Sequence, residues 1–94
     1  MKDYDYYLDK FNDCVQALYT VAKTPSDVDF IKSEEEKKKF ILIFKEISKL
    51  LLILKTFVEF SFDKEKLFMS EQTYEDFKSK YYLIYDQVKK QEKN

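Results

Sequence analysis

The side chains of this chain that could do chemistry are 18 carboxylates, 17 lysines, eight tyrosines and a single thiol, Cys14. Histidine, arginine and glycine are absent. Without histidine, neither a serine or cysteine nucleophile with an imidazole base nor a tetrahedral Cys/His zinc site can form. Without glycine, phosphate-binding loops and nucleophile elbows lose the residue that their turns require. Carboxylates therefore remain as the only candidates for acid or base catalysis.

Pairs of acidic residues spaced four apart, Asp5 with Asp9 and Glu71 with Glu75, could present two carboxylates on one helix face. Calcium and magnesium sites need several converging oxygens, which such a pair does not supply. A carboxylate pair for glycoside hydrolysis needs a cleft, which a small helical bundle rarely forms. We therefore expect no catalytic, metal-binding or cofactor-binding residue in this chain.

One stretch near the C-terminus interleaves lysines with tyrosines, a pattern that can hold backbone phosphates and stack bases. Its members are Lys78, Lys80, Tyr81, Tyr82, Lys89 and Lys90. The commoner explanation is a solvated outer helix face, and a net charge of −1 without arginine gives no general attraction to nucleic acid. Direct DNA contact by this chain is therefore the weaker alternative.

Apolar residues recur every three or four positions over residues 3–22, which predicts a first helix. Pro25 follows it, and proline disfavours helix geometry at the preceding residue. We predict a loop over residues 24–32, with Val28, Phe30 and Ile31 inserted into the core.

Ser33, followed three residues later by Glu36, has the spacing of a capping box and marks the start of a second helix. Its apolar pattern predicts continuation to about Glu59. Asp63 could then cap a short turn over residues 64–67, after which Phe68 and Met69 turn inward.

A third helix is predicted after Ser70, with a stripe that repeats every three or four residues: Tyr74, Phe77, Tyr81, Ile84, Tyr85 and Val88. No linker or internal repeat divides the chain. We expect an all-α fold for residues 1–94, a single small bundle of three helices, or four if the short connecting turn is counted.

The hydrophobic run KLLLILKTFVEFSFD at residues 49–63 raises the question of a membrane span, which needs about 20 consecutive apolar residues. Here lysines and glutamates interrupt the apolar runs FILIF at 40–44 and LLLIL at 50–54, so we expect no membrane contact. The start of the chain has no signal-peptide pattern, and a single cysteine cannot form an internal disulfide. A reduced, cytoplasmic location is therefore expected.

Most apolar residues of the second helix fall on one broad stripe from Phe40 to Val58, which predicts its core face. The remaining apolar residues of this helix project from the side opposite the core face. Either the neighbouring helices cover this second face, or it docks onto a partner. The candidate docking residues, with two from the outer side of the third helix, are Ile41, Leu42, Leu52, Ile53, Tyr82 and Leu83.

From Ser33 onward, the chain resembles the helical region that follows the motor domains in the R (restriction and translocation) subunit of type I restriction-modification enzymes. The segments that carry the resemblance are LKTFVEF at 54–60 and YEDFKSKY at 74–81, continuing to Tyr85 and Asp86. The TPSDVDFI segment and the helix before it are also similar to this family. The resemblance thus covers nearly the whole chain.

The resemblance implies that the chain is a fragment of a larger multidomain subunit. In this family, other domains of R carry the nuclease and two ATP-driven motors that pull DNA, for which ATP and magnesium are the expected cofactors. None of those motifs occurs here, so the resemblance implies a non-catalytic scaffold or docking domain. Its expected partners are the motor domains and the methyltransferase and specificity core, with DNA a partner of the full enzyme. The alternative function is a stand-alone helical protein-protein interaction module.

Overall fold

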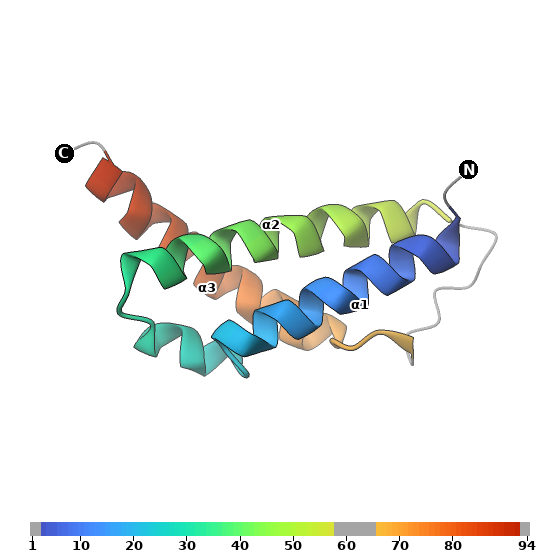
Figure 1. Cartoon of the computed structure of the whole chain (residues 1–94), viewed down its shortest axis with the longest axis horizontal. Coiled ribbons are helices and arrows are strands. Elements are labelled where there is room, and N and C mark those ends of the chain that lie inside the picture. Colours follow the sequence, from blue (N-terminus) through green and yellow to red (C-terminus); the bar gives the residue numbers. More distant parts are fainter. Residues whose placement is uncertain (1–2, 58–65, 93–94) are drawn as a thin grey trace.

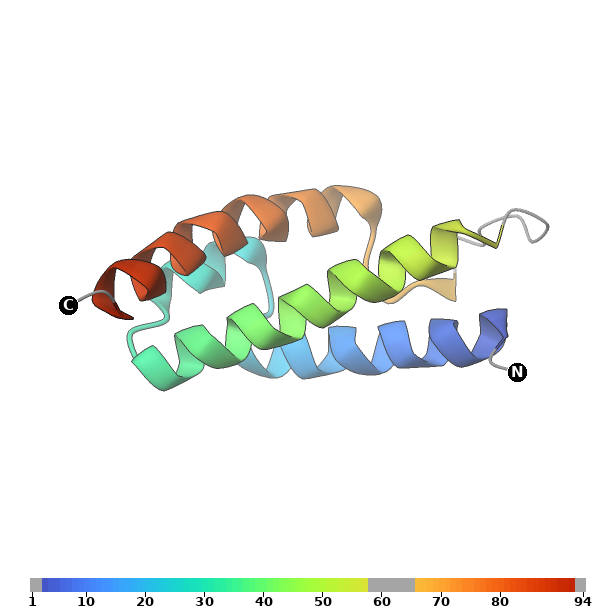
Figure 2. The same ribbon diagram turned by 90° about the horizontal axis from the view of Figure 1, so that it is seen from above.

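The structure, a computed structural model, describes residues 3–57 and 66–92, which form three α-helices and one 3₁₀-helix. In chain order these are α1 (Tyr4–Val21), η1 (Pro25–Phe30), α2 (Glu34–Lys55) and α3 (Glu71–Glu92). α1 and α2 lie antiparallel and side by side, and α3 crosses them obliquely, with its C-terminal half beside the start of α2 (Figure 1, Figure 2). The predicted small all-α bundle is confirmed.

A polar side chain caps the start of each long helix. Asp3 Oδ1, Ser33 Oγ and Ser70 Oγ each accept a hydrogen bond from the backbone N–H three residues further on, at 3.0, 3.3 and 3.1 Å. These bonds satisfy donors that have no partner within the helix. The helix starts predicted at Ser33 and after Ser70 are confirmed.

Residues 25–30 form η1 rather than the predicted loop. Thr24 and Asp27 make a complete capping box, with each side chain bonded to the other's backbone N–H. Side chains three residues apart align in a 3₁₀-helix, so Val28 and Ile31 point together into the core. Phe30 lies on another side and is 75% exposed, so its predicted insertion into the core is wrong.

α2 ends at Lys55, about four residues before the predicted end near Glu59. The Thr56 hydroxyl donates to the carbonyl of Ile53 at 2.6 Å, and Phe57 is not helical. Such local side-chain bonds to backbone compete with helix continuation. Asp63 and the first two residues of the turn predicted over 64–67 lie outside the described residues.

The core forms where the three helices meet. Its largest fully buried side chains include Phe11 of α1, Phe40 and Phe44 of α2, and Phe77 of α3. Phe40 packs on Phe44 and Phe77, with ring centroids 6.0 and 6.3 Å apart. Aromatic contacts of this kind add to the free energy gained from apolar burial. The predicted core stripes of α2 and α3 are confirmed for their described residues.

Candidate docking surface

Several large apolar side chains remain on the surface of the described part of the chain. Leu42 and Leu52 of α2 are 69% and 68% exposed, and Tyr82 and Leu83 of α3 are 56% and 58% exposed. These four belong to the predicted docking set. Leu42 and Leu52 lie about three turns apart on α2, and Tyr82 and Leu83 are neighbours on α3.

The other two members of that set are not on the outer surface. Ile41 lies on the side of α2 opposite the core face, as predicted, but is only 7% exposed and belongs to the core, so at this position a neighbouring helix covers the second face. Ile53 is half-buried and lines a hollow between α1 and α2, together with Tyr7, Cys14 and Leu50.

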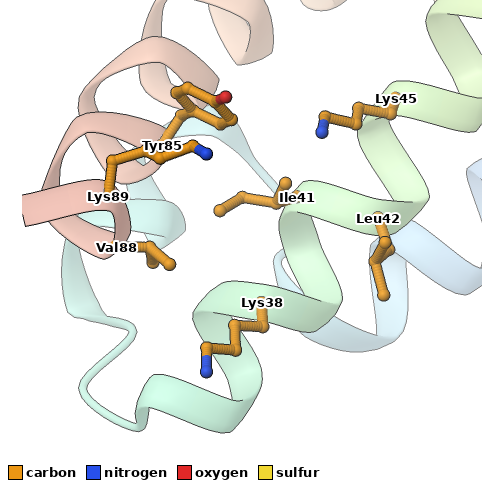
Figure 3. Close-up of a pocket in the computed structure, with 7 residues that line it drawn as sticks. All are labelled: Lys38, Ile41, Leu42, Lys45, Tyr85, Val88 and Lys89. Carbon is orange, nitrogen blue, oxygen red and sulfur yellow. The ribbon is translucent and has the colours of Figure 1, made fainter. Parts of the chain in front are cut away.

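The oblique crossing of α3 explains why Ile41 is covered. Ile41 and Leu52 are 11 residues apart, so they point in nearly the same direction from the α2 axis. Val88 and Tyr85 of α3 lie against the start of α2 and shield Ile41 (Figure 3). Leu52 lies about three turns further along α2 and is 68% exposed.

A groove of about 270 Å³ lies between the first half of α2 and the last half of α3 (Figure 3). Ile41, Leu42 and Val88 supply its apolar surface. The remaining lining consists of Tyr85 and three lysines, namely Lys38, Lys45 and Lys89. The groove is therefore apolar along its floor and positively charged along its rim.

Tyr85 lies close to two of the three lysines at this rim. The ammonium groups of Lys45 and Lys89, one from each helix, lie 5.3 and 5.6 Å from the centre of its ring. Cations at this distance are attracted to the face of an aromatic ring. Both ammonium groups thus lie at the groove, on exposed lysines.

A second hollow lies between α3 and η1, and its apolar lining includes Leu83, Val28 and Ile31. At its edge, Lys80 of α3 forms an ion pair with Asp29 of η1, with an N–O distance of 2.7 Å. This bond joins residues 51 positions apart in the sequence. Lys80, part of the basic stretch considered for nucleic-acid binding, is thus engaged within the fold.

Tyr81 and Cys14 also have structural roles. The Tyr81 ring packs on Phe44 at 5.2 Å, and burial, with Tyr85 and Tyr82 nearby, raises the pKa of its hydroxyl above the usual 10.0. Burial likewise raises the pKa of the Cys14 thiol above its usual 9.0, and carboxylates nearby add to the effect. A raised pKa keeps the thiol protonated and poorly nucleophilic near neutral pH.

Sequence reasoning missed a polar clamp on the connection between α2 and α3. Asn12 of α1 accepts from the N–H of Phe68 at 3.0 Å and donates to the carbonyl of Lys66 at 2.9 Å. Tyr19 donates to the carbonyl of Phe68 at 3.2 Å. These bonds hold the backbone of Phe68 toward α1, and its ring is 51% exposed, so its predicted inward position is wrong. Met69 is buried, as predicted.

No group of three or more metal-ligating side chains occurs among residues 3–57 and 66–92. Over the same residues, no helix is both long enough and apolar enough to cross a membrane. The features that remain to be explained are the exposed apolar side chains and the lysine-rimmed groove. Together with the fold, they describe a small helical domain with exposed apolar side chains and a lysine-rimmed groove.

Comparison with known proteins identifies the family. All 94 residues match the family described as type I restriction and modification enzyme, subunit R, C terminal. The chain belongs to this family. The resemblance noted in the sequence is thereby confirmed.

Two relatives are endonuclease subunits of type I restriction enzymes from staphylococci. The one from Staphylococcus saprophyticus is 49% identical over 95% of this chain, and one from Staphylococcus aureus is 43% identical over 96%. The chain spans about a tenth of the length of these relatives.

The fold also matches a crystal structure, a fragment assigned to a type I restriction enzyme R protein from Bacteroides fragilis. The two share 30% sequence identity with a TM-score of 0.79, over 89% of this chain and 99% of that one.

Proposed function

We propose that this chain is a non-catalytic docking domain of a type I restriction enzyme R subunit. In this proposal it packs on the motor domains of the same subunit and couples them to the methyltransferase and specificity core. ATP, magnesium and DNA cleavage belong to other domains of the longer subunit. The chain would thus contribute to translocation and cleavage by holding the assembly together.

One observation carries this proposal: several large apolar side chains stay exposed, four of them from the predicted docking set, on a domain that corresponds to a tenth of its relatives' length. Leu42, Leu52, Tyr82 and Leu83 are each more than half exposed. A residue that stays exposed in the isolated domain can be covered when the rest of a longer subunit is present. The lack of histidine and glycine also supports a non-catalytic role.

The test uses the subunit encoded by the complete reading frame that contains these 94 residues. Leu52→Lys with Leu83→Lys should weaken its assembly with the methyltransferase core, or loosen the domain within the subunit, as measured by sedimentation and limited proteolysis. Gln16→Lys, at an exposed position of α1, is the control. Unchanged assembly and unchanged proteolysis would contradict the proposal. A start and stop codon at the two ends of these 94 residues would favour the stand-alone interaction module instead.

A further inference from the structure

We infer that the groove between α2 and α3 binds an acidic, apolar segment of the longer subunit. Carboxylates of that segment would pair with Lys38, Lys45 and Lys89. Its apolar side chains would lie on the groove floor, where Leu42 is 69% exposed while Ile41 and Val88 are already buried. The inference rests on the proposed docking function and adds to it the location of one contact and the chemistry of the partner.

The floor of the groove suits side chains from a docked segment. Ile41 and Val88 approach from opposite helices and point toward each other (Figure 3). The volume of about 270 Å³ is slightly below the range of roughly 300–1,000 Å³ of small-molecule sites. An open groove between two helices is instead typical of sites that bind the apolar face of an amphipathic helix.

The lysines at the rim indicate that the partner segment is negatively charged. All charged residues that line the groove are lysines, and within the described part of the chain none of the three forms an ion pair. Elsewhere, Lys37 and Lys80 have carboxylate partners, Glu34 at 3.5 Å and Asp29 at 2.7 Å. The groove lysines therefore present positive charge that no carboxylate in the described part of the chain pairs with, and complementary charge gives such contacts specificity.

A nucleic acid fits this groove less well than an acidic segment. Stacking of bases needs an accessible aromatic face. The Tyr85 ring already has Lys45 and Lys89 beside it, and its centre lies 5.8 Å from that of Tyr81. The chain as a whole also carries a net charge of −1. The shared attraction of phosphate and carboxylate to lysine makes DNA the competing outcome of the test.

The experiment measures how tightly the fluorescently labelled 94-residue chain binds the remainder of its own subunit, expressed without these residues. Lys45→Glu with Lys89→Glu reverses two charges at the rim. The matched control, Lys39→Glu with Lys90→Glu, makes the same change of net charge on the same two helices at exposed positions outside the groove. We expect the rim variant to bind about tenfold more weakly or worse, with the control near the unsubstituted chain.

The outcomes separate this inference from the proposed function. Equal binding by the rim variant and the unsubstituted chain would overturn the groove assignment, while loss of binding by Leu52→Lys with Leu83→Lys would still support docking. Absence of binding by the unsubstituted chain would overturn both. A labelled DNA duplex that binds the unsubstituted chain and not the rim variant would overturn the acidic partner. Binding to the subunit remainder that weakens with added salt would support it.

Discussion

Asn12→Ala tests the clamp that positions the connection before α3. The Asn12 amide makes two hydrogen bonds to backbone groups of Lys66 and Phe68, 54 and 56 residues away. Each such bond contributes about 1 kcal/mol net, so their loss costs about 2 kcal/mol. Alanine is the better helix former by about 0.6 kcal/mol, which offsets part of this cost. The expected net loss in free energy of unfolding is about 1.4 kcal/mol.

Urea unfolding followed by far-ultraviolet circular dichroism measures this loss, and thermal unfolding should show a Tm lower by about 6–11 °C for a domain of this size. Asp13→Ala is the control, because it has a similar gain in helix propensity at an exposed position of the same helix. It should be neutral or slightly stabilising. A free energy for Asn12→Ala within about 0.3 kcal/mol of that for Asp13→Ala would refute the clamp.

Three further predictions follow from burial. Ile41→Lys should destabilise the domain by at least about 3 kcal/mol, while Leu42→Lys should change the free energy of unfolding by less than about 0.5 kcal/mol; similar urea midpoints would contradict the assigned burial. Phe77→Ala, which empties the centre of the core, should cost about 3–5 kcal/mol in the same assay, and a cost below about 1 kcal/mol would show that Phe77 is not a central core residue. In the folded state, the pKa values of the Cys14 thiol and the Tyr81 hydroxyl are raised. The free energy of unfolding should therefore stay constant below about pH 9 and fall as the pH rises through the raised pKa values. Urea midpoints between pH 7 and 11 check this, and Cys14→Ala with Tyr81→Phe should make the decline shallower.

Much of the fold could be predicted because local rules operate over a few residues. A serine or threonine before a helix, and apolar residues at intervals of three and four, placed the starts of α2 and α3 and their core stripes. The same rule applies to η1, since Thr24 and Asp27 have capping-box spacing, although the proline between them also signals the end of a helix. The early end of α2 depends on the Thr56 hydroxyl, and helix ends of this kind carry a weaker sequence signal.

The docking surface was harder to predict, because a helical period specifies direction around an axis and not position along it. Ile41 and Leu52 have nearly equivalent directions, yet only Ile41 lies under α3. That difference arises from the oblique crossing of α2 and α3. The same crossing brings Lys45 and Lys89 together around Tyr85, although 44 residues separate them. A charged groove built in this way has no contiguous sequence signature, so its partner is better sought through charge reversal at the groove than through a motif search.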